Sequence, residues 1–168
     1  FIIVTGLSGA GKSRAIDAME DIGFYCVDNI PPKLIPTFYD LCKTSNEKVA
    51  VVTDIRGGKM FNNLIEVLDR LKKDNKPYKI LYLDAREDVL LRRYKETRRK
   101  HPLIEKKQAS ILEAIRLEKE VLKTIKEQSD YIVDTSYISP AQLKSRISSL
   151  FLEDAEDALM IDCESFGF

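Results

Sequence analysis

Near its beginning the chain carries the run Gly6-Leu7-Ser8-Gly9-Ala10-Gly11-Lys12-Ser13, which matches the pattern GxxxxGK[ST]. The run follows an apolar stretch and precedes a helical pattern, the strand–loop–helix context that this P-loop (Walker A) motif requires. Glycines let the backbone bend around an anion, so that successive N–H groups and the positive end of the following helix face phosphate oxygens. Lys12 would reach the β- and γ-phosphates, and the Ser13 hydroxyl would bind Mg²⁺. The motif therefore predicts a Mg²⁺-dependent site for ATP or GTP.

Short apolar runs alternate with amphipathic helical patterns along the rest of the chain. Strands are expected at Phe1–Thr5, Phe24–Asp28, Lys48–Ile55, Tyr78–Asp84 and Asp130–Asp134. Helices are expected at Lys12–Ile22, Pro32–Cys42, Met60–Lys73, Glu87–Lys100 and Ala109–Glu127. The strand runs are apolar without clean alternation, which is typical of parallel strands buried on both faces. We therefore expect an α/β P-loop NTPase fold of the kinase-like type, a three-layer sandwich with a mostly parallel five-stranded sheet.

The last residues differ from the rest in composition. The stretch 153–164 holds six acidic residues and no basic one, and it includes a new apolar run at 158–161. We expect residues 1–152 to form the P-loop nucleotide-binding domain. Residues 153–168 are expected to form an acidic connector and the first strand of a C-terminal domain that is missing from the sequence.

Two acidic residues end predicted strands and are candidates for the metal site. Asp54 closes the run that begins at Lys48, and Asp28 closes the run that begins at Phe24. Ligands of open α/β sheets bind outside the carboxyl ends of the strands, so both carboxylates should face the site. We assign the metal to Ser13 and Asp54. Asp28 is the alternative candidate, which would position the metal, the attacking group or an acceptor. An ordinary turn position is the alternative for Asp54.

A basic segment follows the fourth predicted strand. Between Arg86 and Lys107 there are nine Lys or Arg residues against four acidic ones. Arg92 and Arg99 are seven residues apart and share a helix face, so they could clamp the γ-phosphate and stabilise charge in the transition state. The candidate catalytic side chains are thus Lys12, Asp54, Asp28, Arg92 and Arg99. The alternatives for the arginines are a solvated basic face and a patch that contacts RNA phosphates.

Charge, hydropathy and cysteine content limit the partners and the cellular compartment that the sequence predicts. Lys plus Arg equal Asp plus Glu at 27 each, so net charge gives no argument for a nucleic-acid partner. No apolar run approaches the roughly 20 residues of a membrane span. The three cysteines (Cys26, Cys42 and Cys163) are odd in number and widely spaced. We expect reduced thiols, a cytoplasmic protein and no membrane association.

Several longer stretches resemble one family. They are Asp21 through Pro31 (DIGFYCVDNIP), Asp54-Ile55-Arg56, Arg92 through Pro102 (RRYKETRRKHP), Ile132 through Ser136 (IVDTS) and the final Glu164 through Phe168 (ESFGF). Together with the P-loop, these stretches are similar to the RapZ/YvcJ family of bacterial nucleotide-binding proteins, and the resemblance spans essentially the whole chain.

The resemblance carries implications of its own. It implies ATPase and GTPase activity, with the ATP site at Gly6 through Ser13 and a GTP-contacting segment formed by Asp54, Ile55, Arg56 and Gly57. Relatives often carry a polar residue in place of Gly57, so a side-chain role there does not transfer. Some members act as adaptors for a small RNA that controls amino-sugar synthesis. The resemblance places such RNA or protein partners mainly on the C-terminal domain.

Three functions remain as hypotheses. The leading one is a Mg²⁺-dependent ATP- or GTP-binding domain with slow NTPase activity in a regulatory protein. The second is a small-molecule kinase with an acceptor at Asp28, because phosphoryl transfer needs the same positioning and charge neutralisation. The third is a nucleotide sensor in which hydrolysis is incidental. The guanine-reading NKxD motif is missing, since Asn75-Lys76-Pro77-Tyr78 lacks its Asp, so GTP use should be loosely selective.

Overall fold

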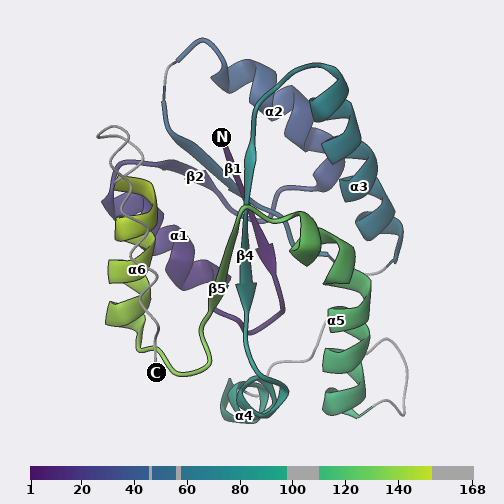
Figure 1. The fold of residues 1–168 in the computed structure, drawn as a ribbon, viewed down its shortest axis with the longest axis vertical. Coiled ribbons are helices and arrows are strands. Elements are labelled where there is room, and N and C mark those ends of the chain that lie inside the picture. The colour runs from purple at the N-terminus through teal and green to yellow at the C-terminus, as the bar shows by residue number, and fades with distance from the viewer. Residues whose placement is uncertain (46, 56–57, 98–109, 153–168) are drawn as a thin grey trace.

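The computed structural model describes residues 1–45, 47–55, 58–97 and 110–152, and Figure 1 shows a central sheet between layers of helices. The strands are β1 (Ile2–Gly6), β2 (Tyr25–Val27), β3 (Val49–Val52), β4 (Lys79–Asp84) and β5 (Tyr131–Asp134). They form one sheet in the order β2-β3-β1-β4-β5, and every neighbouring pair is parallel. The predicted α/β fold with a parallel five-stranded sheet is confirmed.

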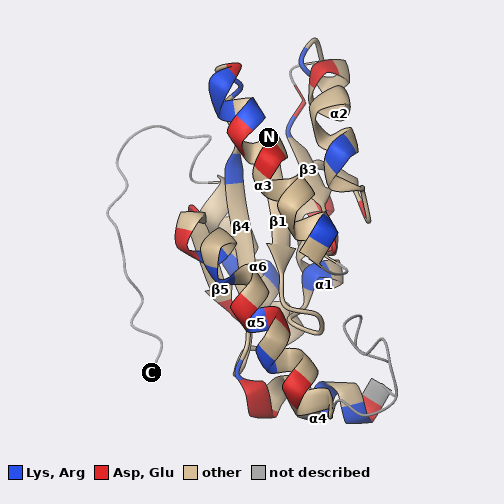
Figure 2. Ribbon diagram, turned by 90° about the vertical axis from the view of Figure 1, so that its right-hand side faces the viewer, with Lys and Arg blue, Asp and Glu red and all other residues tan. Residues whose placement is uncertain are grey.

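Burial explains why the strands read as apolar runs. Every residue of β1 and of β3 is buried, as is the middle of β4, whereas the edge strands β2 and β5 are partly exposed. Charged residues are concentrated on the helices, and the inner strands of the sheet hold few of them (Figure 2). A strand covered by helices on both faces has no solvent side, so polar and apolar residues do not alternate along it.

Helices cover both faces of the sheet. They are α1 (Lys12–Asp21), a 3₁₀ turn η1 (Pro32–Leu34), α2 (Ile35–Cys42), α3 (Gly58–Lys73), α4 (Glu87–Thr97), α5 (Ile111–Gln128) and α6 (Pro140–Leu152). Figure 1 shows α1 and α6 on one side and α2, α3 and α5 on the other. The apolar stripe of α3 is buried and consists of Leu64, Val67, Leu68 and Leu71. The three-layer arrangement is thereby confirmed.

The sequence patterns placed no helix after Glu127, and α6 corrects this. Its residues Leu143, Ile147 and Phe151 are buried at helical spacing, and the helix packs against α1. The overlooked start signal is at Ser139, whose Oγ accepts from the N–H of Gln142 at 3.2 Å. The Gln142 side chain in turn accepts from the N–H of Ser139 at 2.8 Å, so the two residues form a capping box.

Some expectations lie outside the described residues. They concern Arg56, Gly57, Arg99, Cys163 and the proposed connector 153–168. Of the cysteines that the structure describes, Cys26 and Cys42 are free thiols, and burial raises the pKa of Cys26 to about 11. In the same part of the chain, no helix has the length and apolar character needed to cross a membrane.

Candidate functional site

The predicted phosphate loop connects β1 to α1 at the carboxyl edge of the sheet. Gly6 has φ +142°, and a Cβ there would lie 2.2 Å from the carbonyl oxygen of Leu83 on β4. Gly9 and Gly11 also have positive φ values, and Gly11 is the N-cap residue directly before α1. The first N–H groups of a helix have no partner within the helix, so those at the start of α1 are available to an anion. The glycines of the motif thus serve the backbone geometry that an anion site needs.

Lys12 folds back over this loop. Its Nζ donates to the carbonyl oxygens of Gly6 and Leu7, each at 3.1 Å. The same ammonium lies 3.3 Å from Oδ1 of Asp54. The Lys12 side chain is 12% exposed and that of Asp54 is 31% exposed, so the ion pair is only partly screened by solvent. The structure therefore brings together the lysine of the motif and one of the two acidic candidates.

Strand order explains why Asp54 and not Asp28 reaches the lysine. Asp54 follows β3, which pairs directly with β1, whereas Asp28 follows β2, which lies one strand farther out. Asp54 lines the cleft beside the loop, while Asp28 is exposed and is not among the described residues that line it. The geometry favours Asp54 as the acidic partner of the phosphate loop.

A cleft of about 850 Å³ opens over the loop. Its walls come from the loop and α1, from Asp54, from α4, and from the turn and first residues that lead into α6. The lining residues are Ser8, Gly9, Ala10, Gly11, Lys12, Ser13, Arg14, Asp17, Asp54, Arg93, Tyr94, Thr135, Ile138, Ser139, Pro140 and Leu143. Such a volume lies within the range of small-molecule sites. The predicted residues from Ser8 to Ser13 therefore share one cavity with Asp54.

The arginine that lines the cleft is Arg93 and not the predicted Arg92. Arg92 is exposed, and its Nε lies 4.0 Å from the carboxylate of Glu96. Arg93 Nη1 donates to the carbonyl oxygen of Gly9 at 2.9 Å, and its Nη2 donates to that of Thr135 at 2.7 Å. Desolvation by burial, followed by the charge of Arg92, lowers the pKa of Arg93. Arg93 thus ties the phosphate loop to the end of β5.

Thr135 completes this connection. Its hydroxyl donates to the carbonyl oxygen of Ala10 at 2.6 Å, and its side chain is buried. The contacts that Arg93 and Thr135 make with the loop use its carbonyl oxygens, so they do not occupy its N–H groups. The position of the loop is therefore fixed from the carbonyl side of its peptides.

Glu118 on α5 is a site residue that the sequence interpretation missed. Its carboxylate accepts from the N–H of Ser8 at 2.5 Å and from the Ser8 hydroxyl at 2.8 Å, and its side chain is only 3% exposed. A buried carboxylate of this kind needs hydrogen-bond donors, and the phosphate loop supplies them. The available signal was an acidic residue on the apolar stripe of α5, between Ile115 and Leu122.

Two other predicted contact residues are core side chains. Leu7 is fully buried and Ile55 is 8% exposed. Leu7 takes part in the loop through its backbone, where its N–H donates to the carbonyl oxygen of Leu83 at 3.1 Å. The side chain of neither residue lines the described cleft. Their structural role is to seat the loop and the end of β3 on the core.

A family model described as the RapZ-like N-terminal domain matches residues 1–155. A nucleotide-binding protein of Caldicellulosiruptor bescii is 48% identical, over 99% of this chain and 59% of its own length. A nucleotide-binding protein of Caldanaerobacter subterraneus is 46% identical, over 100% of this chain and 60% of its own length. The chain therefore spans about three fifths of the length of these relatives.

Solved structures share the fold at low sequence identity. The tunicamycin resistance protein of Deinococcus radiodurans has a TM-score of 0.59 and 16% identity, covering 89% of this chain and 94% of its own. Shikimate kinase from Bacteroides thetaiotaomicron has a TM-score of 0.58 and 19% identity, covering 90% of this chain and 97% of its own. These likenesses show that the chain shares its overall fold with both proteins.

Proposed function

The chain belongs to the RapZ-like N-terminal domain family, and from that premise we propose that its cleft binds ATP or GTP with Mg²⁺ and hydrolyses it slowly, in the service of a regulatory protein. The observation that carries the proposal is the position of Lys12, which spans the phosphate loop and reaches Asp54 at the mouth of the cleft. The names of the relatives as nucleotide-binding proteins agree with it.

Backbone N–H groups and one ammonium would bind the phosphates. Gly9 through Ser13 line the cleft, and Lys12 would supply the positive charge for the β- and γ-phosphates. Arg93 and Thr135 hold the loop from its carbonyl side, so the donors are preorganised before a nucleotide arrives. Preorganised donors stabilise developing charge without rearranging in the reaction.

The donor set also fits a magnesium ion. Ser13 is exposed and lines the cleft, and Asp54 lines the same cavity. Oxygen ligands of this hard kind, completed by phosphate oxygens and water, are those that Mg²⁺ prefers. When bound, the ion would neutralise charge on the transferred phosphoryl group. Asp54 would bind the ion, and Lys12 would contact the phosphates.

The kinase hypothesis receives less support from the geometry. It placed an acceptor at Asp28, and the described cleft does not include that residue. The likeness to shikimate kinase concerns the fold alone. This chain spans only about three fifths of the length of its relatives. The RNA or protein partners that the resemblance implies are therefore proposed for the longer protein.

Phosphate release from Mg-ATP and Mg-GTP tests the proposal with a matched pair of variants. Asp54→Asn removes the proposed metal ligand and is expected to lower Mg²⁺-dependent turnover at least about ten-fold. Asp28→Asn removes the carboxylate of an exposed residue outside the described cleft, and turnover should stay within about two-fold of the parent chain. Equal losses in both variants, or turnover that ignores Mg²⁺, would contradict the assignment of Asp54.

A further inference from the structure

A second cavity, of about 390 Å³, lies at the edge of the sheet opposite the phosphate loop. Ile2 opens β1, Phe24 and Lys48 directly precede β2 and β3, Lys79 opens β4, and Phe151 lies at the end of α6. Because the five strands are parallel, their amino ends meet at this edge and their carboxyl ends meet at the cleft. The described residues that line the two cavities do not overlap. We call this cavity the aromatic pocket.

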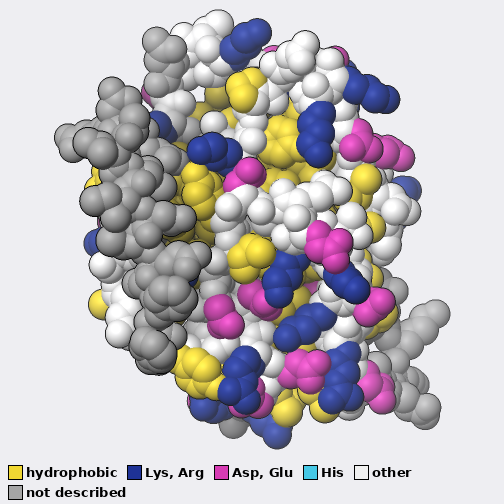
Figure 3. Space-filling view, viewed as in Figure 1, with side chains coloured by type: hydrophobic (Ala, Val, Ile, Leu, Met, Phe, Trp, Pro, Cys, Tyr) yellow, Lys and Arg dark blue, Asp and Glu magenta, His cyan; other side chains and the backbone are white. Residues whose placement is uncertain are grey.

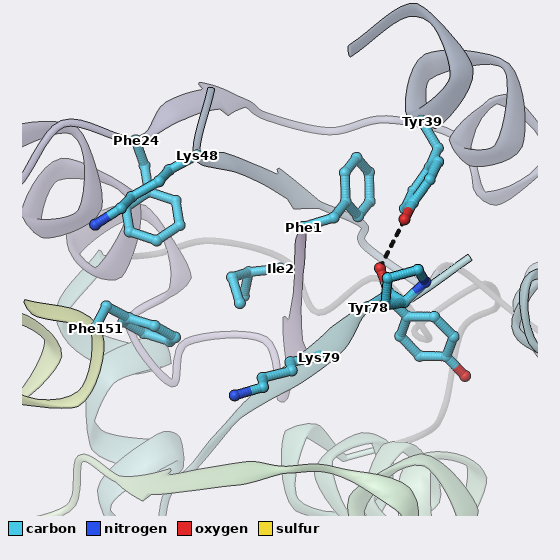
Figure 4. Close-up of a pocket in the computed structure, with 9 residues that line it drawn as sticks. Phe1, Ile2, Phe24, Tyr39, Lys48, Tyr78, Lys79 and Phe151 are labelled. Atoms are coloured by element: carbon cyan, nitrogen blue, oxygen red, sulfur yellow. Dashed lines mark hydrogen bonds between the residues drawn. The ribbon is translucent and has the colours of Figure 1, made fainter. Parts of the chain in front are cut away.

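The walls of the aromatic pocket are rigid rings. Phe151 meets Phe24 edge to face with ring centroids 5.6 Å apart, and it meets Tyr131 in the same manner at 5.1 Å. Tyr39 on α2 donates from its hydroxyl to the carbonyl oxygen of Pro77 at 2.8 Å, which fixes the opposite wall. Figure 4 shows Phe24, Ile2 and Phe151 around an open space. Edge-to-face pairing with a further ring is the interaction that such walls favour.

Two ammonium groups stand at the rim. Lys48 Nζ lies 5.8 Å from the Phe24 ring centroid and forms no ion pair with the described part of the chain. Lys79 Nζ lies 3.1 Å from the Tyr131 hydroxyl and 5.5 Å from that ring's centroid. In Figure 4 both amino groups reach toward the same side of the open space. No carboxylate is among the described residues that line the pocket, and the charged side chains in that lining are Lys48 and Lys79.

The surface view places these features within reach of solvent. Figure 3 shows hydrophobic side chains exposed near the amino end of β1, with Lys or Arg side chains beside them. Lys48 and Lys79 are both exposed. A ligand could therefore enter the pocket while the sheet and its helices stay in place.

We propose that the aromatic pocket is a binding site for a small planar aromatic anion. The ring of the ligand lies against Phe24, Ile2 and Phe151, and its anionic group faces Lys48 and Lys79. The cavity has the volume of a small-molecule site, and apolar walls with a few fixed charges are the usual composition of such sites. The proposal is independent of nucleotide binding, since the two cavities lie at opposite edges of the sheet.

A pair of fluorescent probes with the same ring system tests the charge and the walls separately. The probes are 8-anilino-1-naphthalenesulfonate, which is anionic, and N-phenyl-1-naphthylamine, which is uncharged. We expect one saturable site per chain for the anionic probe. The double variant Lys48→Met with Lys79→Met should weaken that site about ten-fold and leave the uncharged probe within about two-fold. Lys123→Met, which removes an exposed charge on α5, is the matched control and should change neither affinity.

Folding and site identity are checked in the same samples. Both lysines are exposed, so the double variant should unfold cooperatively at nearly the temperature of the parent chain. Saturating Mg-ATP should not displace the anionic probe. The proposal is overturned if the probe does not saturate, if the double variant binds it as tightly as the parent does, or if Mg-ATP displaces it.

Discussion

Replacing Lys12 with alanine is expected to weaken the binding of Mg-ATP and Mg-GTP about 30- to 1000-fold, which corresponds to roughly 2–4 kcal/mol. The reason is that Lys12 is the ammonium that spans the phosphate loop, with its Nζ 3.1 Å from two loop carbonyl oxygens. The variant leaves the backbone donors in place, so weak residual binding should persist. Calorimetric titration of the two chains gives the ratio of dissociation constants.

The fold should survive this change. The variant loses the partly exposed ion pair and the two hydrogen bonds of Lys12. We expect this loss to lower the free energy of unfolding by about 1 kcal/mol. Lys33→Ala on η1, an exposed lysine away from the cleft, is the matched control and should bind as the parent chain does. Unchanged affinity in Lys12→Ala, with cooperative unfolding retained, would remove the proposed site.

The second large effect is expected at Gly6. Its φ of +142° is unfavourable for other residues, and a Cβ there would lie 2.2 Å from the oxygen, 2.7 Å from the nitrogen and 2.9 Å from the carbonyl carbon of Leu83. These are backbone atoms of β4, an inner strand of the sheet, which cannot move aside as a flexible side chain can. We expect Gly6→Ala to cost at least about 4 kcal/mol of unfolding free energy, a large part of the stability of an ordinary domain.

Gly23→Ala separates backbone strain from the steric clash. Gly23 also has a positive φ, +97°, but nothing lies within 4 Å of the position of its Cβ. That variant should therefore lose only about 1–2 kcal/mol. Urea unfolding followed by circular dichroism measures both. If Gly6→Ala were no more costly than Gly23→Ala, the close approach of the loop to β4 would not exist in solution.

Short sequence patterns predict those parts of the site whose signal lies within one stretch of the chain. The phosphate loop is contiguous, and Asp54 closes an apolar run, so spacing alone predicts both. Asp28 also closes a predicted strand, so this signal does not distinguish it from Asp54. Strand order distinguishes the two, because β3 and not β2 pairs with β1. Strand order depends on which strands pair in space, and no short pattern encodes it.

Helix phase explains why Arg93 and not Arg92 lines the cleft. Successive helix residues point about 100° apart, so a shift of one position moves a side chain from the cleft to solvent. The buried residues Val89, Leu90 and Tyr94 fix the phase of α4 and put Arg93 on the inner face. Glu118 was missed for a different reason. Its partner Ser8 is 110 residues away, so the contact appears only when α5 is placed against the sheet.

Amide chemical shifts recorded during a titration with Mg-ATP test the central claim most directly, because they locate the nucleotide on the chain. The account predicts that the largest changes fall on Gly9 through Ser13 and on Asp54, with the aromatic pocket around Lys48 and Lys79 unaffected. No shifts at millimolar nucleotide, or shifts concentrated away from the phosphate loop, would contradict it.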